Sequence, residues 1–432
     1  MDQLAKLEAL AGELLIATKS LLEHCHSIDA PLYGTSGRPA QLIPPGARAE
    51  AHRARESTIA SLTKLRVMLA GPTDFLQDMA SQSQLLACMQ WLGEFQVPAC
   101  IPLNGSILMK EVSDLIGVPE DKLCRVIRMA ATGGFLQEPQ PGHVAHSALS
   151  ASFVANPSYQ DAAIFLAGTA VPAALEMAHI TQKNRKSSGQ TPNSVISNRS
   201  AFSTPNRNEL PRLRRQWHAY LRHGTGLVCD TATDILTCLE PLQNALVVEV
   251  GARSTERVAA LVDQYPTLHF TVQLNPAFQR RNGARHSRID VQHRALGSPQ
   301  PIQGAAVYIL NFPFPEPGGP STPVVAQIRA ELEAHFNVLR LTHAATLVLT
   351  MPLQSERGEV GPDTAVLSQI RDLSLLQLAG ERELEISEVI SVLNGVGDND
   401  GRLVLVNKVT SALNQGVVAL EFKYQAYTIV SY

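Results

Sequence analysis

Short apolar segments alternate with helix-like segments from residue 245 onward, and this alternation constrains the fold more than any other feature. Apolar runs predict strands at Leu246–Val250, His269–Leu274, Val307–Leu310, Ala345–Met351 and Leu403–Val409. Apolar residues at helical spacing predict helices at Ser254–Tyr265, Val324–Leu341 and Ile386–Leu393. Because parallel strands need a crossover between them, the alternation predicts a doubly wound, mostly parallel α/β sheet over residues 241–432, of the Rossmann-like class.

Residues 1–80 are predicted to form helices without a core of their own. One stripe at helical spacing carries the residues Leu4, Leu7, Ala11, Leu14, Thr18 and Leu21. Helical periodicity returns from Glu50 to Leu69, after a proline- and glycine-rich segment at 30–47 that is predicted to be a loop. A stripe without its own partner helix tends to pack on another domain or another subunit. We therefore predict that residues 1–80 serve dimerisation.

Residues 81–155 have the element order of a winged helix-turn-helix. The predicted order is an apolar helix at 83–95, a turn at 102–106, helices at 110–116 and 119–131, and short strands at 135–136 and 143–144. Gly117 stands where the first short helix ends, and Pro119, Glu120 and Asp121 stand where the second begins. Helix, turn, helix and hairpin in this order are typical of the winged-helix fold.

Residues 156–240 are predicted to form a helical connector with a flexible insertion. The insertion, 183–209, is rich in serine and asparagine and cannot bury enough surface to order itself. Lys183, Arg185 and Lys186 are a weak hint of a nuclear import signal, and a solvated loop is the simpler interpretation. The most apolar run, Ala162 to Leu175, contains a proline and is too short to span a bilayer, so no membrane association is expected.

Composition and motif content argue against several classes of protein. With 36 basic and 39 acidic residues the net charge is −3, which gives no support to strong DNA binding by this chain alone. The six cysteines are too sparse for a disulfide scaffold, and no pair has the spacing of a structural zinc site. We interpret His143 and His146 as surface residues of the hairpin and predict no metal site. Because the start of the chain lacks the pattern of a secretory signal, a soluble intracellular protein is expected.

The segment Val247–Thr255 (VVEVGARST) lies where a nucleotide-binding loop belongs, between the first strand and the first helix of the α/β domain. A winged helix followed by a domain that opens with VVEVG resembles the fungal and plant O-methyltransferases that use S-adenosylmethionine. The resemblance implies a class I methyltransferase sheet and an N-terminal helix that serves dimerisation. That family's loop reads acid-x-Gly-Gly-Gly-x-Gly, because cofactor atoms approach the backbone where a Cβ would collide. Glu249 and Gly251 match the acid and the first glycine, although a strand end and its turn explain them equally well.

Most residues that the family needs for its cofactor and its reaction are replaced here. Arg253 stands at the closest approach to the cofactor, and Leu274 replaces the acid that binds the ribose hydroxyls. Arg294 replaces the acid of the His-Asp pair that frames the adenine. Pro315 occupies the place of the catalytic histidine, and proline can do no proton chemistry. We therefore predict a vestigial loop, no cofactor and no catalytic residue.

The second helix of a DNA-binding winged helix enters the major groove. Lys122, Arg125 and Arg128 share one face of the predicted helix at three-residue spacing. Over residues 110–130, however, the basic and acidic residues balance. We favour packing of this module on a second subunit over direct DNA reading, and we keep the three residues as a weak candidate DNA-binding face.

Four stretches resemble a narrower group of proteins than the enzyme family. They are residues 83–103 (SQLLACMQWLGEFQVPACIPL), 134–138, 141–147 and 372–378 (DLSLLQL). These stretches resemble the transcriptional co-activators of fungal aflatoxin-type polyketide clusters, the aflJ- or aflS-like proteins, with similar members in anthraquinone and monodictyphenone-type clusters. The resemblance implies a methyltransferase-like protein without evident enzymatic activity. It also implies association with a zinc binuclear-cluster activator from the same gene cluster.

The expected function is therefore that of a homodimeric, catalytically inactive, nuclear co-activator of polyketide-cluster transcription, which reaches DNA indirectly through its zinc-cluster partner. One alternative is an S-adenosylmethionine-dependent O-methyltransferase, or an isomerase of the same fold, that tailors the polyketide. Arg253, Leu274, Arg294 and Pro315 speak against this alternative. A second alternative is a scaffold for biosynthetic enzymes, which would leave transcript levels unchanged.

Overall fold

The computed structural model of the chain divides into two compact units. It describes residues 3–26, 43, 47–186, 210–227, 235–276, 287–312, 314–317, 322–354, 362–411 and 416–427. The first unit comprises Met1–Pro172 and Arg215–Tyr220, and the second comprises Ala173–Arg214 and Leu221–Tyr432. The four-part division at residues 80, 155 and 240 stays a prediction. Most of the predicted insertion, from 187 to 209, and most of the predicted loop at 30–47 lie outside the described residues.

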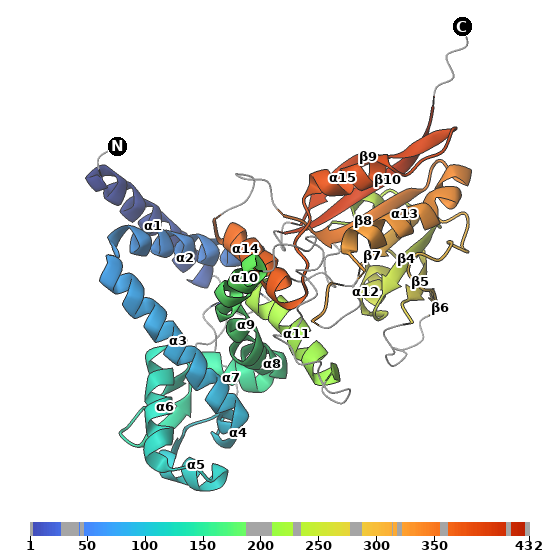
Figure 1. Ribbon diagram of the computed structural model, residues 1–432. Helices are drawn as coiled ribbons and strands as arrows, with labels where there is room; N and C mark the ends of the chain where they lie inside the picture. Colours follow the sequence, from blue (N-terminus) through green and yellow to red (C-terminus); the bar gives the residue numbers. More distant parts are fainter. Residues whose placement is uncertain are drawn as a thin grey trace. The chain divides into compact units, whose positions relative to one another are not determined.

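The first unit carries the N-terminal helices and the winged helix-turn-helix (Figure 1). Its elements are α1 (Gln3–His26), α2 (Ala49–Leu69), α3 (Pro72–Glu94), α4 (Val97–Cys100), β1 (Ser106–Leu108), α5 (Met109–Ile116), α6 (Glu120–Thr132), β2 (Leu136–Gln137), β3 (His143–His146), α7 (Ala148–Ala155) and α8 (Pro157–Phe165). The predicted helices are confirmed. Helix α3 begins earlier than predicted, because Pro72 occupies its first turn and the Asp74 carboxylate accepts a hydrogen bond from the Gly71 backbone at 2.8 Å.

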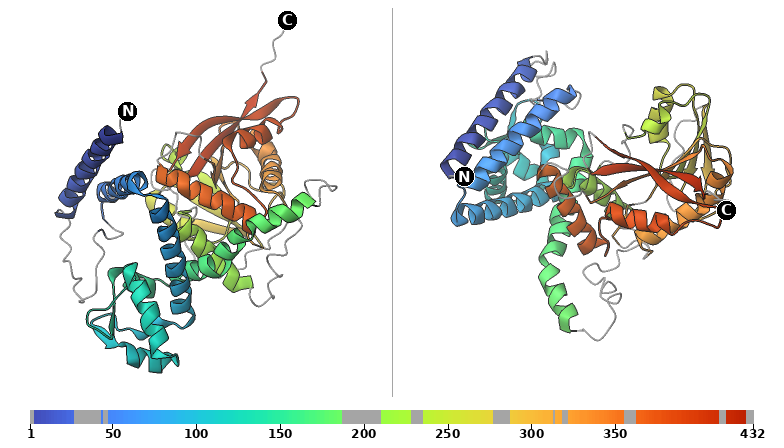
Figure 2. Two further views of the ribbon diagram at one scale, coloured as in Figure 1. Left: turned by 60° about the vertical axis from the view of Figure 1, so that its left-hand side comes forward. Right: turned by 90° about the horizontal axis from the view of Figure 1, so that it is seen from above.

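Helices α1 and α2 run side by side (Figures 1 and 2). Their contact is built mostly from small residues, with Leu10, Ala17, Ala51, Ala54 and Ser61 buried. Of the stripe predicted for α1, Leu7, Leu14, Thr18 and Leu21 are half-buried, whereas Leu4 and Ala11 are exposed. The premise that this stripe lacks a partner helix was wrong, since α2 is that partner.

The winged helix-turn-helix of residues 81–155 folds around a continuous apolar core. Leu92 of α3, Met109 of α5, Leu123 and Ile127 of α6 and Val144 of β3 are fully buried in it. The three strands form an antiparallel sheet of order β1-β3-β2. Strand β1 was not predicted: it begins at the last residue of the turn predicted at 102–106 and precedes the helix predicted at 110–116. Its three residues are too few to show a strand pattern, and they become a strand because β3 pairs with them.

His146 was predicted to lie on the surface of the hairpin, and it is instead buried at the end of β3. Its Nε2 lies 3.1 Å from the Pro98 carbonyl oxygen and 3.2 Å from that of Ile101, so this nitrogen carries the proton and donates. Its Nδ1 accepts a hydrogen bond from the Ser150 hydroxyl at 2.8 Å. Burial lowers the pKa of His146. The imidazole therefore acts as a neutral clamp that fixes the end of α4 to β3.

The apolar run at 162–175 belongs to a longer helix than the sequence predicted. Helical structure continues from Pro157 to Gln182, a length of 26 residues, so the run is long and apolar enough by length and composition to cross a membrane. The prediction that it is too short was wrong. One such helix is weak evidence for a span, because core helices pass the same test. Only 17% of its apolar window is buried, although Phe165 on this helix packs against Trp217 and Tyr220 with ring centroids 5.4 and 5.3 Å apart.

The second unit is built on a seven-stranded sheet of order β6-β5-β4-β7-β8-β10-β9. Its elements are α10 (Met177–Lys186), β4 (Leu246–Ala252), α12 (Glu256–Gln264), β5 (His269–Leu274), β6 (Ile289–His293), β7 (Val307–Asn311), α13 (Val324–Leu341), β8 (Thr346–Pro352), α14 (Pro362–Leu378), α15 (Ile386–Asn394), β9 (Gly401–Thr410) and β10 (Val417–Ala426). Helices α9 (Val171–Leu175) and α11 (Leu210–Gly224) contribute to both units. The predicted mostly parallel α/β sheet is confirmed: β10 runs antiparallel to both β8 and β9, and the other pairings are parallel.

Helices cover both faces of this sheet. Helices α13 and α15 pack on one face and share an apolar core with the strands, to which β4 contributes Val248 and Val250 (Figures 1 and 2). Because side chains alternate along a strand, Val247 and Glu249 point to the opposite face. Glu249 there approaches Arg257 of α12. The end of β4 thus lies between α12 and the neighbouring parallel strands, where a ligand of this fold class would bind.

Candidate functional site: a closed cofactor loop

The turn after β4 is closed by the protein's own backbone. Gly251 has φ +74°, and a Cβ added there would collide with the main-chain oxygen of Asn311 at the end of β7. The same Cβ would also lie 3.4 Å from Cδ2 of Leu296. Glycine is therefore required for the close approach of two strands and for the left-handed backbone. A bound cofactor is not needed to explain it.

The loop acid Glu249 is held in a buried polar network. The Asn311 amide donates to Glu249 Oε1 at 2.8 Å, and Arg257 Nη1 lies 3.7 Å from the same oxygen. Arg257 also donates to the Asn311 side-chain oxygen at 2.7 Å, and so does the Thr350 hydroxyl at 3.0 Å. The side chains of Arg257 and Glu249 are only 6% and 3% exposed. The network joins β4, α12, β7 and β8, so Glu249 serves the packing of the sheet.

Arg253 and the segment around Pro315 are tied together by a neighbouring carboxylate. Arg253 lies 3.5 Å from Glu316 Oε1, and Arg214 lies 2.9 Å from Glu316 Oε2. Pro315 is half-buried beside this bridge. The segment at the family's catalytic position is therefore fastened to the cofactor loop. No local spacing indicates a role for Glu316, because both arginines are distant from it in the chain.

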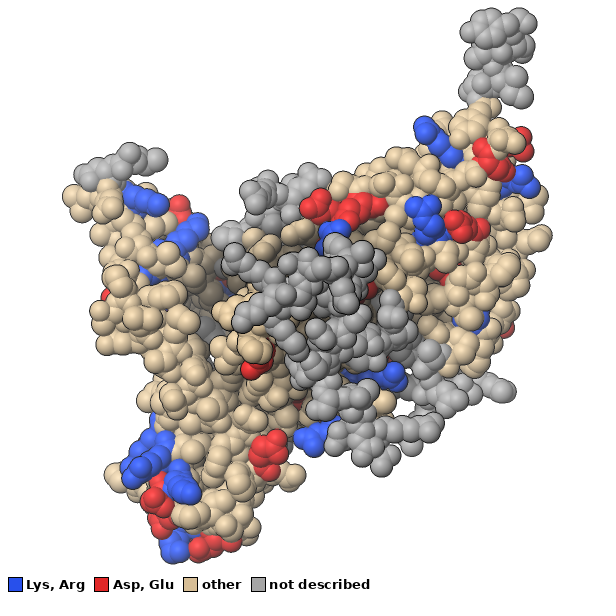
Figure 3. Space-filling view, viewed as in Figure 1, with Lys and Arg blue, Asp and Glu red and all other residues tan. Residues whose placement is uncertain are grey.

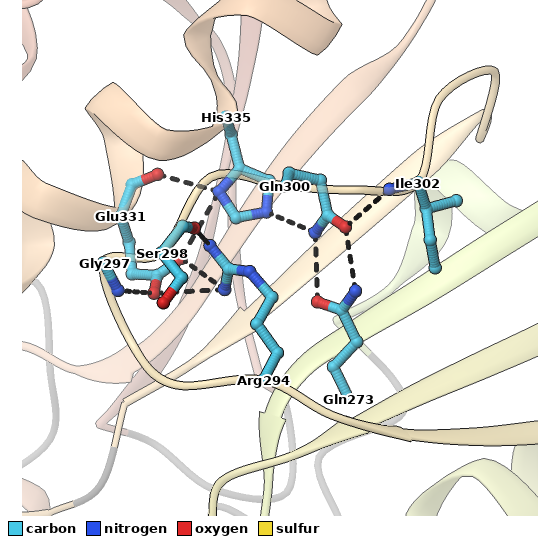
Figure 4. Close-up of polar contacts among 8 residues, drawn as sticks. All are labelled: Gln273, Arg294, Gly297, Ser298, Gln300, Ile302, Glu331 and His335. Atoms are coloured by element: carbon cyan, nitrogen blue, oxygen red, sulfur yellow. Dashed lines mark hydrogen bonds and ion pairs between the residues drawn. The ribbon is translucent and has the colours of Figure 1, made fainter.

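Arg294 points into the α/β domain and is neutralised there (Figure 4). Its Nη1 lies 3.2 and 3.0 Å from the two carboxylate oxygens of Glu331 on α13, and the two side chains are 5% and 1% exposed. Its Nη2 donates to the Ser298 carbonyl, and the Gly297 backbone donates to Glu331. Burial raises the pKa of Glu331, and the Gly297 N–H and Arg294 oppose that rise. The guanidinium thus holds the loop after β6 against α13.

A second part of this network continues through amides (Figure 4). His335 Nδ1 lies 2.8 Å from the Glu331 carbonyl oxygen, which can only accept, so this nitrogen is protonated. His335 Nε2 then accepts from Gln300 Nε2 at 2.9 Å. Gln300 and Gln273 exchange two hydrogen bonds of 2.8 and 3.0 Å. Burial lowers the pKa of His335 to about 3, so the imidazole is neutral at physiological pH.

The residues present do not fit S-adenosylmethionine, the cofactor that the methyltransferase fold implies. Leu274 is buried at the end of β5 and has no oxygen with which to accept from ribose hydroxyls. Glu249 is engaged by Arg257 and Asn311, and the Arg294 guanidinium is engaged by Glu331. Glu249 Oε1 and the two Nη atoms of Arg294 are thus bonded within the protein, and Leu274 offers only an apolar side chain. Within the part of the chain that the structure describes, no group of three or more metal-ligating side chains gathers either.

The three candidate DNA-binding residues lie on one exposed face of α6, as predicted. Arg128 is held by Glu138 through bonds of 3.1 and 3.2 Å, and Glu138 also accepts from the Gly142 backbone at 3.0 Å. Arg128 therefore helps to fix the wing. Lys122 and Arg125 stand exposed. In Figure 3, basic and acidic side chains are interspersed over this part of the molecule, which leaves no uniformly basic surface on the face shown.

Comparison with known proteins gives similarity over nearly the whole chain. Residues 4–70 match the family model described as the N-terminal domain of the trypacidin cluster transcriptional coactivator tpcD. The agnestins biosynthesis cluster transcriptional coactivator AgnL9 of Paecilomyces divaricatus is 58% identical over 99% of this chain and 100% of its own length. The monodictyphenone cluster transcriptional coactivator mdpA of Emericella nidulans is 41% identical over 99% of both chains. The dothistromin biosynthesis regulatory protein aflJ of Dothistroma septosporum is 38% identical over 98% of this chain and 99% of its own.

Solved structures with the same fold are much less similar in sequence. OxaC has a TM-score of 0.66 at 17% identity, over 98% of this chain and 100% of its own. The structure of LepI in complex with SAM has a TM-score of 0.63 at 15% identity, over 86% of this chain and 94% of its own. At such identities the likeness establishes the fold alone. It confirms a methyltransferase-like architecture that includes the helical N-terminal part.

Proposed function

The chain belongs to the fungal family of transcriptional coactivators of polyketide gene clusters, and from this premise we propose that it activates transcription of such a cluster without acting as a methyltransferase. The observation that carries the function is similarity over the full length to proteins named as coactivators. The alternative of a polyketide-tailoring enzyme is not favoured. The absence of catalysis is supported by the network around Glu249 and by the engagement of Arg294 with Glu331.

Titration of the purified chain with S-adenosylmethionine is expected to give no binding heat. The physical reason is that the cofactor would have to displace the Arg257 and Asn311 contacts of Glu249 and would find Leu274 in place of a ribose acceptor. An active O-methyltransferase of the same fold, titrated alongside, serves as the control. Dissociation constants in the range of about 1–100 μM for this chain would contradict the proposal.

We further propose that the chain acts as a homodimer through its N-terminal helices. Large apolar side chains stay exposed on α1, α2 and the start of α3: Leu4, Leu15, Ile16, Leu22, Ile59, Leu62, Val67, Leu69, Phe75, Leu76 and Met79. The contact between α1 and α2 buries mainly alanine and serine, which is too little to stabilise two long helices in water. A second copy of the same helices supplies the missing apolar layer.

The partner is proposed to be the zinc-cluster activator of the same gene cluster, and the site of action the nucleus. DNA would then be reached mainly through that activator, with Lys122 and Arg125 of α6 free to touch phosphates beside it. Reversing the charge of Lys122 and Arg125 together, with Arg128 kept because Glu138 holds it in the wing, is expected to lower promoter occupancy, measured by chromatin immunoprecipitation, by about 3- to 10-fold. Occupancy equal to that of the unaltered chain would remove DNA contact by α6 from the account.

A further inference from the structure

A cavity of about 520 Å³ lies beside strand β1 of the winged helix-turn-helix. It is lined by the residues at the end of α4 and just after it, by all of β1, by Glu111 of α5 and by His143 of β3. We name it the β1 groove. The lining includes Ile107, whose side chain turns to one face of the sheet, and Ser106 and Leu108, which turn to the other. The groove therefore runs along the edge of the strand.

That edge of β1 has backbone groups available for pairing. In the order β1-β3-β2, β1 has a single neighbour. The Met109 N–H donates to the Gly142 carbonyl at 2.8 Å, which places the hydrogen-bonded pairs of this ladder at Met109 and Ile107. The N–H and C=O of Ser106 and the N–H of Leu108 consequently point toward the outer edge, while the Leu108 carbonyl, at the N-cap of α5, accepts the first hydrogen bond of that helix. Among the described residues, no backbone hydrogen bond from another segment reaches Ser106 on that side.

The wall of the groove opposite β1 is held in place before anything binds. His146 donates to the carbonyls of Pro98 and Ile101, and this clamp fixes the end of α4 to the same sheet that carries β1. Leu108 is 42% exposed, and Ile101 is buried beside it in the lining. A groove that is formed before binding loses little conformational entropy when a segment enters it.

The charge of the groove selects among partners. Glu111 is its one carboxylate, and it takes part in none of the ion pairs formed among the described residues. A carboxylate beside apolar walls disfavours the phosphates of a nucleic acid and favours a basic side chain. Side chains two positions apart in an extended segment face the same side, so an apolar residue and a basic residue at that spacing can enter together.

We propose that the β1 groove binds an extended segment of a protein partner by strand addition at Ser106 and Leu108, with an apolar side chain against Ile101 and Leu108 and a lysine or arginine, two positions away, paired with Glu111. This inference rests on the proposed function, because the segment is assigned to the zinc-cluster activator. Strand addition supplies affinity through main-chain hydrogen bonds and specificity through the side chains that enter pockets.

The test uses the full chain and labelled overlapping peptides of about 15 residues that cover the activator, with binding measured by fluorescence anisotropy. At least one peptide with an apolar-x-basic pattern is expected to bind. Glu111→Arg and Ser106→Pro are each expected to weaken it by about 10-fold or more. Ser106→Pro removes an outward N–H and leaves the pairing with β3 intact. Asp121→Arg, at an exposed acid in the first turn of α6 outside the groove, is the matched control and is expected to change binding by less than about 2-fold.

The possible results distinguish a failure of the proposed groove from a failure of the proposed partner. Undiminished peptide binding by both groove variants overturns the proposal, and so does an effect of these variants on duplex DNA binding alone. If the full-length activator binds the chain but no peptide does, the groove is wrong and the coactivator function stands. If the full-length activator does not bind at all, the groove and the zinc-cluster partner are both wrong.

Discussion

Replacing Glu331 with alanine is expected to lower the free energy of unfolding by about 3–5 kcal/mol, because the change leaves a buried guanidinium without its counter-charge. Arg294 is 5% exposed, and its Nη1 lies 3.0–3.2 Å from the two Glu331 oxygens. The Gly297 N–H loses its acceptor in the same substitution. Urea denaturation followed by circular dichroism measures the loss.

The control is Glu333→Ala, two residues along the same helix at an exposed position, which is expected to change stability by less than about 0.5 kcal/mol. The double variant Arg294→Met with Glu331→Leu removes both charges and is expected to recover most of the stability lost in Glu331→Ala. Equal stability of Glu331→Ala and Glu333→Ala would show that the network of Figure 4 does not hold the domain together.

Introducing glutamate at Leu15 and Leu22 of α1 is expected to raise the dissociation constant of the homodimer by about 100-fold or more. Leu4, Leu15 and Leu22 are spaced by eleven and seven residues, close to whole helical turns, so they form one exposed apolar line. A carboxylate in that line would be buried without a partner in the dimer. Analytical ultracentrifugation over a concentration series measures the constant.

Lys6→Glu is the control, since residue 6 is exposed on α1 and falls on the side of the helix away from that line and from Ile16. It also introduces a glutamate on α1 and is expected to leave the association unchanged. If the double leucine variant still forms the dimer, the interface lies elsewhere. If the unaltered chain is a monomer, the proposed homodimer is wrong.

The elements that the sequence predicted well are those with a strong local pattern. Strand β4 is an apolar run interrupted by the charged Glu249, and α6 has its cap signals and a buried face with Leu123 and Ile127. Strand β6 was missed because it is an edge strand whose residues from Asp290 to His293 are exposed, so burial imposes no alternation. Strand β1 was missed because only its neighbour makes it a strand.

The sequence did not predict helix α14, because this helix buries a charged side chain and exposes apolar ones. Arg371 is buried on it and lies 2.6 Å from the buried Glu383, while Val366 and Leu373 of the same helix are exposed. A pattern that equates apolar with buried cannot find such a helix. The inversion follows from a buried ion pair whose partner lies beyond the helix, and only the folded chain brings the two together.

The sequence was sufficient to predict which cofactor-binding and catalytic groups the candidate site lacks. It was not sufficient to predict the polar contacts that the replacing residues make. Leu274 and Pro315 can be read directly as losses of an acid and a base, since neither side chain can supply that chemistry. The role of Arg294 depends on Glu331, which lies 37 residues further along the chain. The polar neighbours of Glu249 likewise come from other elements, and no local spacing indicates such pairs.

The most direct test of the account is the transcript level of the cluster's genes in a fungal strain from which this gene is deleted, measured together with the metabolites that the strain makes. A coactivator without enzymatic activity predicts that transcripts of the biosynthetic genes fall together and that the pathway product disappears without a modified intermediate. Complementing the deletion with a Gly251→Ala gene would not serve as a cofactor-loop control. A Cβ at this position collides with the Asn311 backbone, so the variant would disturb the fold itself. Unchanged transcripts with accumulation of an intermediate that lacks one methyl group would contradict the account and identify the chain as a methyltransferase.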